Sequence, residues 1–599
     1  MVPIAPITES QFVYLLRRCT PPTGWPQKIA VAYSAGADST CLLFLLQQLA
    51  QSRQYPDLPR EIHALFVNHR LQPANNDMAK VARRTAQMLG AVDHEVSIPW
   101  GVDVYPPKPG PGEPLEELAR NARYQTLFEG MGRRGTDVIA FGHHADDQVE
   151  TALMRWARGS TTLGLAGMRG VRRWGMGFGK DQNTVGWFGT LGMKRWIVRL
   201  LLPVSKDRIL ATCEEHKLNY VNDPTNFQPD LTPRNAIRHA LSQMRGSATN
   251  SDGQAIVSSL QPPPNAISQQ MHALRTTNND VSRAPVPFDV TGDIEDLRQS
   301  VQEFHERVGD VEDAATACLD RFSVSSPPAT FLLAAGNLHT IENGLTRTAM
   351  ILRILRYISP APWGSVTSQA GRRTDSLNRI VSRVFNSEPP ASERVPFVAG
   401  ANVLWTPLRI RTDGRLKHFA PLPNAIAGPA PASEPDVKEE DAATAWGWIA
   451  SRAPPAADQR DATTINLSEA LVSARRIRKK WRRKIEGGGE MSVFEILWDN
   501  RFNITFNLDR MPPALSKALG LEDGRNSVVV YPETRWMWPR VVWKREGKDD
   551  VLLARITVPE MVWYTRFDKR TRYKVEQPYT GEDWLDWVDI EFIRTKDAI

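Results

Sequence analysis

Short apolar runs alternate with amphipathic stretches over residues 28–244. The apolar runs predict strands at residues 29–33, 62–67, 92–98, 138–141 and 196–202. Helical periodicity between them predicts helices at residues 40–51, 78–89, 115–129 and 145–158. This alternation is typical of a doubly wound, mostly parallel α/β sheet. Because ligands of such sheets bind at the carboxyl ends of the strands, the residues that follow each strand are the candidates for chemistry.

The pattern changes beyond this first domain. Residues 245–285 are rich in Ser, Asn, Gln and Pro, and residues 424–462 in Ala, Pro, Asp and Glu, so both predict disordered linkers. Helical periodicity returns over residues 286–420 and predicts a mainly helical domain. Residues 463–599 predict a small α+β region, with strands at residues 493–498, 502–506, 527–531 and 551–558.

Two segments of the N-terminal half interrupt the regular alternation. The glycine-rich residues 172–193 predict a surface insertion. Residues 1–27 and the lysine that follows them hold three basic side chains and one acid, which is compatible with an organellar transit peptide. The alternative, which we favour, is a short helix over residues 9–19 that packs on the first domain. No stretch approaches the ~18 uninterrupted apolar residues of a membrane span, so we expect a soluble chain without a membrane partner.

The positive charge of the chain is concentrated in one place. The 599 residues include 74 Lys and Arg against 67 Asp and Glu, a net charge of +7. A run of eight basic residues within ten could neutralise RNA phosphates, and its tryptophan could stack on a base. A nuclear localisation signal or a solvated helix face are the alternatives. The run consists of Arg475, Arg476, Arg478, Lys479, Lys480, Trp481, Arg482, Arg483 and Lys484 around one isoleucine.

The first predicted strand leads into a loop of small residues and then into a helix. Backbone N–H groups of such a loop, with the positive end of the helix dipole, form a phosphate-binding nest. Gly36 would let the backbone approach an anion, and a carboxylate at Asp38 makes sense there if it holds Mg²⁺ that bridges phosphate oxygens. The alternative is a tight strand–helix turn capped by Ser and Asp. The loop is Ser34, Ala35, Gly36, Ala37, Asp38 and Ser39.

Other polar residues follow the second strand or lie on the third predicted helix. Asn68 and His69 end the second strand, at the same sheet edge as the loop, although a histidine there is more often an ordinary loop residue. Arg120 and Arg123 lie three apart and share one helix face. They form either a solvated basic face or a clamp on phosphate or RNA.

Ionisable residues also follow the fourth strand. If the helix includes His143, then Asp147 and Glu150 follow it at i+4 and i+7 and project from the same face. Such a group suits a metal contact or the recognition of an amino group, whereas a capped helix with an acidic first turn is the alternative. Arg234 and Arg238 have helical spacing and suit an RNA backbone, although a solvent-facing basic helix fits the spacing equally well.

Together these segments resemble the tRNA(Ile)-lysidine synthetase family of the PP-loop ATP pyrophosphatase superfamily, whose fold is Rossmann-like. The SGGxDS signature of the superfamily is present as Ser-Ala-Gly-Ala-Asp-Ser, with Ala35 in place of the first glycine. The resemblance covers about residues 28–244 and includes residues 141–151, 222–226 and 232–239. Beyond residue 244 it is limited to residues 497–502, which look like a motif in the C-terminal part of some members.

The resemblance implies a two-step modification of an isoleucine tRNA with a CAU anticodon. The C2 oxygen of the wobble cytidine would attack the α-phosphorus of ATP, and pyrophosphate would leave. The amine of free L-lysine would then displace AMP to give lysidine. The implied ATP-binding residues are Ser34, Ala35, Gly36, Ala37, Asp38, Ser39, Asn68 and His69.

The resemblance also implies roles for the ionisable residues. Mg²⁺ would lie at Asp38 and Asp147, and Arg123 would help to stabilise pyrophosphate. Asp147 and Glu150 would hold the lysine ammonium, and His143 or a nearby carboxylate would act as base. Together with Asp38, these residues form the predicted catalytic set.

Four alternatives or open points remain at this stage. A thiolase of the same superfamily needs cysteines, usually as CxxC, but none of the four cysteines is so placed, and neither zinc nor an iron–sulfur cluster is expected. A non-catalytic RNA-binding protein on a degenerate PP-loop domain is the rival from another class. In eukaryotes the substrate of this family is organellar, so the resemblance suggests mitochondria rather than the cytoplasm. The oligomeric state is open, with a homodimer among the options.

Overall fold

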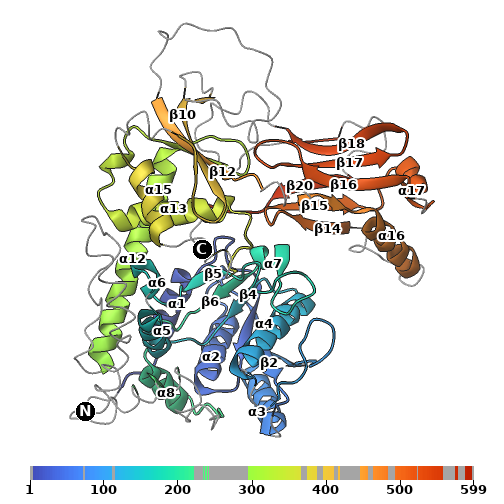
Figure 1. Ribbon diagram of the computed structural model, residues 1–599. Helices are drawn as coiled ribbons and strands as arrows, with labels where there is room; N and C mark the ends of the chain where they lie inside the picture. Colours follow the sequence, from blue (N-terminus) through green and yellow to red (C-terminus); the bar gives the residue numbers. More distant parts are fainter. Residues whose placement is uncertain are drawn as a thin grey trace. The chain divides into compact units, whose positions relative to one another are not determined.

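The computed structural model forms two compact units, residues Met1–Asp313 and Ala314–Ala598, which we describe separately (Figure 1). The long helix α12 (Ile294–Phe322) begins in the first unit and ends in the second. No helix among the described residues is long and apolar enough to cross a membrane. The structure describes residues 4–71, 74–110, 113, 115–158, 160–221, 234, 237, 238, 241, 294–365, 368, 374–386, 395–410, 416–418, 445–455, 463–482, 493–521, 524–557, 574–577 and 587–596.

The first unit contains the predicted α/β sheet. Its strand order is β3-β2-β1-β4-β6-β5, and every neighbouring pair is parallel except β5 with β6. The fold class predicted from the alternating pattern is therefore confirmed. The strands are β1 (Lys28–Tyr33), β2 (Glu61–Asn68), β3 (Val92–Ser97), β4 (Val138–Ala140), β5 (Val171–Arg173) and β6 (Trp196–Val198).

Helices cover both faces of this sheet. Alternate residues of β1 enter two cores: Val31 packs with the side chains of α2, whereas Ala30 packs with those of α4. The N-terminal helix α1 supplies Phe12 and Leu16 to the α2 core, so the predicted helix at residues 9–19 is present. The helices are α1 (Glu9–Arg18), α2 (Ala37–Ser52), α3 (Ala74–Leu89), α4 (Leu115–Arg134), α5 (Ala145–Ala157), α6 (Thr162–Leu165), α7 (Gly189–Lys194) and α8 (Lys206–Glu215).

The predicted surface insertion at residues 172–193 is partly wrong. Strand β5 lies within it and extends the sheet, with Arg172 opposite Ile197 of β6. Trp174 and Phe188 are buried in the α4 core. Aromatic residues among the glycines supply the apolar surface that anchors this segment.

The second unit contains a sheet where the sequence predicted helices and a linker. Its order is β11-β10-β12-β8-β7, with β9 also paired to β10. The helices α12, α13 and α15 confirm the predicted helical character of residues 286–420, and the strands β7 to β11 accompany them. Strand β12 lies inside the linker predicted at residues 424–462. Elements of this part are β7 (Ser323–Val324), β8 (Thr330–Ala334), the 3₁₀ helix Leu338–Thr340, α13 (Gly344–Ile358), α15 (Thr374–Val384), β9 (Phe397–Val398), β10 (Val403–Ile410), β11 (Leu416–His418) and β12 (Ala445–Arg452).

The C-terminal region is the predicted α+β region. Two sheets, β13-β16-β17-β18-β19 and β14-β15-β20, share one apolar core. The linker predicted at residues 245–285 lies outside the described residues. Elements of the region are β13 (Ile465–Asn466), α16 (Ser468–Arg482), β14 (Val493–Trp498), β15 (Phe502–Asn507), α17 (Pro513–Leu519), β16 (Asn526–Pro532), β17 (Pro539–Arg545), β18 (Lys548–Thr557), β19 (Lys574–Glu576) and β20 (Val588–Phe592).

The motif at residues 497–502 is a structural hairpin. Asp499 and Asn500 form the turn between β14 and β15, both with positive φ. Asp499 contacts Arg501 at 2.7 Å and Arg452 at 2.8 Å, and all three side chains are buried. Burial lowers the pKa of Arg501 to about 10, against the opposing effect of Asp499. The motif thus fixes a turn and a buried ion network rather than a reactive site.

Candidate functional site

The loop between β1 and α2 is held by its own serines. The Ser34 backbone N–H donates to Ser39 Oγ at 3.2 Å, and the two hydroxyls lie 3.1 Å apart. The N-cap residue of α2 is Gly36, and no side chain caps this helix end. The N-terminal amides of a 16-residue helix therefore remain available to an anion, which disfavours the alternative of a side-chain-capped turn.

Ala35 carries the backbone strain of this loop. Its φ is +61°, in the left-handed region that favours glycine. The backbone carbonyl of Ala35 accepts from the Val221 N–H at 2.8 Å, and the side chain is buried. Gly36, in contrast, has a φ of −73°. Within the loop, position 35 is thus the one whose conformation favours glycine.

Asp38 lies between Lys206 and His144. Its Oδ1 is 2.5 Å from Lys206 Nζ, at the start of α8, and 3.5 Å from His144 Nε2. Burial would raise the pKa of Asp38, but His144 and Lys206 outweigh it and hold the pKa below its ordinary value. Asp38 is therefore an anion at neutral pH, and Lys206 is a partner that the motif pattern did not predict.

His144 joins Asp38 to Asp147. Its Nε2 lies 3.5 Å from Asp147 Oδ2, and its backbone N–H donates to the same oxygen at 3.1 Å. Burial lowers the pKa of His144, but the two carboxylates raise it above its ordinary value overall. The pKa of the adjacent His143 shifts in the opposite direction.

His143 precedes the helix, which begins at Ala145, so it does not share the helix face of Asp147 as predicted. Its ring stacks on Phe141 with a centroid distance of 5.5 Å, and Nδ1 accepts from Arg199 Nε at 3.1 Å. Burial is the main cause that lowers the pKa of His143 to about 3, although Asp147 opposes it. The imidazole is thus neutral near pH 7.

Asp147 and Glu150 do share one face of α5, and two arginines hold them. Arg234 Nε is 2.7 Å from Glu150 Oε2, and its Nη2 is 2.9 Å from Asp147 Oδ1. Arg238 Nε is 2.8 Å from Glu150 Oε1. Burial would raise the pKa of Asp147, but His144, His143 and the arginine beside it keep the pKa well below its usual range. These arginines point into the site, so they are not a solvent-facing basic face here.

The sequence comparisons agree with this geometry. The family described as "PP-loop domain" matches residues 9–245. We therefore refer to residues 9–245 as the PP-loop domain.

Curated relatives of this domain are named tRNA(Ile)-lysidine synthase. That of Alkalilimnicola ehrlichii is 36% identical over 211 residues, which is 35% of this chain and 40% of the relative. That of Bacillus subtilis is 33% identical over 216 residues, 36% of this chain and 39% of the relative. The resemblance to this family is confirmed over the PP-loop domain. The chain spans less than half the length of these relatives.

Two solved structures also align with the chain. The U34-tRNA thiolase of Methanococcus maripaludis covers 42% of this chain and 78% of its own, with 17% identity and a TM-score of 0.29. The NAD⁺ synthetase of Burkholderia pseudomallei covers 44% of this chain and 86% of its own, with 14% identity and a TM-score of 0.25.

Asp146 has a different partner from its neighbour Asp147. Arg298 of α12 contacts both oxygens of Asp146 at 3.0 Å and also reaches Asp207 at 2.8 Å. The side chains of Arg298 and Asp146 are buried. This network ties α12 to the first turn of α5, a contact between residues 152 positions apart that local sequence patterns do not predict.

The remaining predicted ATP and pyrophosphate residues are Asn68 and His69 at the end of β2 and Arg123 of α4. Asn68 donates to Glu95 at 3.1 Å and accepts from the Arg70 N–H at 3.0 Å, so its side chain orders the end of β2. The backbone carbonyl of His69 accepts from Trp100 at 2.8 Å. Arg123 Nε is buried and, among the described residues, has no hydrogen-bond partner.

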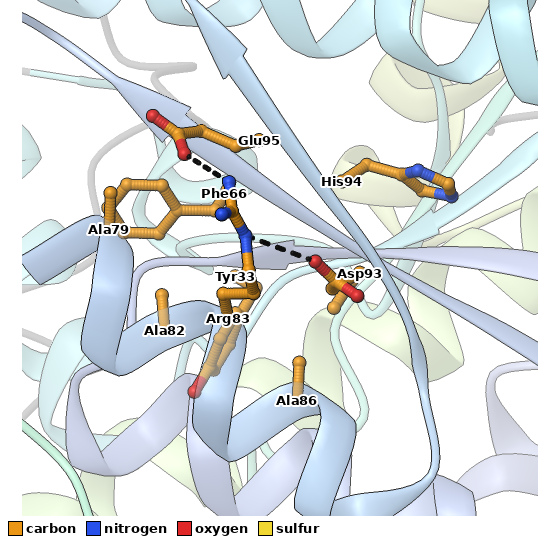
Figure 2. A pocket seen from close by; sticks show the side chains of 10 residues that line it. Tyr33, Phe66, Ala79, Ala82, Arg83, Ala86, Asp93, His94 and Glu95 are labelled. Atoms are coloured by element: carbon orange, nitrogen blue, oxygen red, sulfur yellow. Dashed lines mark hydrogen bonds and ion pairs between the residues drawn. The ribbon is translucent and has the colours of Figure 1, made fainter.

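The PP-loop domain also has a small hollow (Figure 2). It is lined by residues of α3 and of the strands β1, β2 and β3, among them three alanines of α3. Arg83 lies beside it and contacts Asp93 at 3.6 Å and Glu95 at 2.9 Å. The lining includes none of the predicted site residues, so we attribute the hollow to the alanines Ala79, Ala82 and Ala86 of α3.

The basic run lies on and beyond α16. Of its side chains, Arg475 and Arg476 are described, and Arg476 is exposed. The side chains of Arg478, Lys479, Lys480, Trp481 and Arg482 lie outside the described residues, as do Arg483 and Lys484. The segments at residues 222–226 and 232–239 are likewise undescribed except for residues 234, 237 and 238.

Proposed function

We propose that this chain is a tRNA(Ile)-lysidine synthetase. The observation that carries the proposal is the pairing of the nucleotide loop with Asp147 and Glu150, two buried carboxylates on α5 beside it. The likeness of the PP-loop domain to lysidine synthases supports it. An acidic pair of this kind suits an ammonium substrate better than another phosphate.

In the first step, the loop would hold the ATP phosphates at the N-terminus of α2. The wobble cytidine oxygen would attack the α-phosphorus, and Arg123 would stabilise the departing pyrophosphate. A buried guanidinium with an unsatisfied Nε suits an incoming anion. Lys206 beside Asp38 would add a second positive charge at the loop.

Asp38 and Asp147 fit a magnesium ion as a donor pair. Both carboxylates lie 3.5 Å from the same His144 nitrogen, and Mg²⁺ is commonly held by one or two carboxylates together with substrate phosphates. The described residues contain no group of three side chains that could hold a metal on its own. Bound there with ATP, the ion would neutralise developing phosphate charge.

In the second step, the lysine ammonium would take the place of Arg234 and Arg238 at the acidic pair. The arginines occupy Asp147 and Glu150 here, so lysine entry requires their displacement. Released from the carboxylates, they would be free to contact the tRNA backbone, as would the basic run of α16. His143 is neutral and so able to accept a proton, although its low pKa makes it a weak base.

Incorporation of labelled lysine tests the proposal. The chain is incubated with ATP, Mg²⁺, radiolabelled lysine and a transcript of the isoleucine tRNA with a CAU anticodon, and label in the tRNA is counted. We expect label with the wild type and with Asp77→Ala, an exposed surface change, and at least a hundredfold less with Asp38→Ala. ATP-dependent tRNA binding without any label would instead support a non-catalytic RNA-binding protein. Location in mitochondria is a separate proposal, which imaging of the tagged chain tests.

A further inference from the structure

Arginines gather around Tyr124, on the α4 face of the first sheet. Residues of β5 alternate between faces: Val171 packs in the α2 core and Trp174 in the α4 core, which places Arg172 on the α4 side. Ile197 is in the α4 core, so Arg199, two residues later, lies on that side beyond the end of β6. The cluster is thus at the carboxyl edge of the sheet.

Aromatic rings connect this cluster to the candidate site. The Tyr124 ring stacks on Phe141 with a centroid distance of 5.7 Å, and Phe141 stacks on His143. The guanidinium carbon of Arg120 is 5.8 Å from the Tyr124 centroid. Arg120 is exposed, so it can meet a ligand that comes from solvent.

The cluster has little compensating negative charge. In the part of the chain that the structure describes, neither Arg120, Arg123 nor Arg172 has a carboxylate within 4.0 Å. The carboxylates Asp147 and Glu150 are already paired with other arginines.

The pKa shifts of Tyr124 and Arg172 also reflect the neighbouring arginines. Burial would raise the pKa of Tyr124, yet Arg172, Arg199, Arg120 and Arg123 together hold it below its ordinary value. Burial also lowers the pKa of Arg172, and Arg120 lowers it further. Positive charges that depress one another in this way are stabilised when an anion binds.

We infer that Arg120, Arg172 and Arg199, arranged around Tyr124, form a phosphate-binding site distinct from the nucleotide loop. Planar guanidinium groups that lack carboxylate partners match the geometry of phosphate oxygens. The phosphate has two sources under the proposed function on which this inference rests, a phosphodiester of the tRNA or the polyphosphate of ATP. The exposure of Arg120 and the position of the loop at the N-terminus of α2 favour the tRNA.

Binding assays with each probe alone separate these sources. Affinity for the tRNA transcript is measured over a range of salt concentrations, and affinity for ATP with Mg²⁺ is measured without RNA. The variants are Arg120→Gln, Arg172→Gln and Arg172→Lys. Arg133→Gln is the matched control, because it changes an exposed arginine at the other end of the same helix. Thermal melting checks that each variant is folded. If Arg172→Gln does not fold, the test uses Arg120→Gln, which changes an exposed residue.

For a tRNA phosphate we expect each Gln variant to weaken tRNA binding about eightfold at ~0.1 M salt and to reduce the salt slope by about 1. Arg172→Lys keeps the charge, so it should retain the slope and lose only part of the affinity. A loss confined to ATP binding would assign the phosphate to the nucleotide. Unchanged binding of both probes, or equal losses in Arg133→Gln, overturns the inference. Because no readout requires lysine incorporation, failure of the proposed function is recognised separately.

Discussion

Arg234 donates from Nε to Glu150 at 2.7 Å, across 84 positions of sequence. The carboxylate of Glu150 is almost wholly buried, whereas a quarter of the Arg234 side chain is exposed. The same guanidinium reaches Asp147, so one arginine contacts both carboxylates of the candidate lysine site. The pair is therefore expected to contribute to folding as well as to substrate binding.

Arg234→Gln should destabilise the PP-loop domain by about 2 kcal/mol, because it removes the 2.7 Å and 2.9 Å guanidinium contacts of two buried carboxylates, Glu150 and Asp147. Urea unfolding at pH 7 measures the change. The control is Arg83→Gln, which breaks an exposed pair with Glu95 and should cost less than about 1 kcal/mol. Equal costs for the two variants would show that the Arg234 contacts are not maintained in solution.

Ala35→Gly should stabilise the chain by up to about 1 kcal/mol. The substitution removes the strain of a left-handed alanine, and the greater freedom of glycine in the unfolded chain offsets part of the gain. Ala50→Gly near the end of α2 is the matched control and should instead destabilise by about 1 kcal/mol. Denaturant midpoints compare the two. A destabilising effect at position 35 would contradict the left-handed geometry.

The shifted pKa values of His144 and Asp38 should make stability depend on pH, on the alkaline and the acidic side respectively. Its pKa is raised in the folded state, so its contribution is complete below its ordinary pKa of 6.5 and is lost as pH rises through the folded pKa. The pKa of Asp38 is lowered, so its contribution is present above 3.8 and is lost as pH falls. Free energies of unfolding from pH 5 to 9 should therefore decline on the alkaline side, and His144→Gln should flatten that decline. His339→Gln, at an exposed position, should leave the profile of the wild type.

Asp499→Ala should destabilise the second unit by about 3 kcal/mol. It leaves Arg501, which is fully buried, and Arg452 without their carboxylate. Glu546→Ala, which breaks the exposed pair with Arg525, should have little effect. Hydrogen exchange resolved by segment distinguishes the units, and a loss of protection confined to the first unit would count against this ion network.

The strands of the first sheet were predictable because each is a continuous apolar run between polar segments. The run at residues 29–33 differs from β1 by one residue. Strand β12 was missed because Ala, Gly and Ser occupy half of its positions, and this composition is shared with a linker. Its burial depends on pairing with β8 and β10, which no local pattern reports.

The site was predictable only where its residues are close in sequence. The helical spacing of Asp147 and Glu150 placed both on one face, since a helix sets that relation locally. Lys206, Arg199 and Arg298 approach from other elements, so their contacts depend on tertiary packing. For these three residues, the sequence shows no more than a lysine or arginine near the start of a helix or just after a strand.

The unit that folds is longer than the segment that carries the motifs of the PP-loop domain. A fragment of residues 28–244 would contain every predicted catalytic residue. It would lack α1, which fills the α2 core with Phe12 and Leu16, and α12, which covers Val149 of α5 with Leu297 and Val301. The smallest stable fragment should therefore begin before Thr8, the cap of α1, and extend through residue 313.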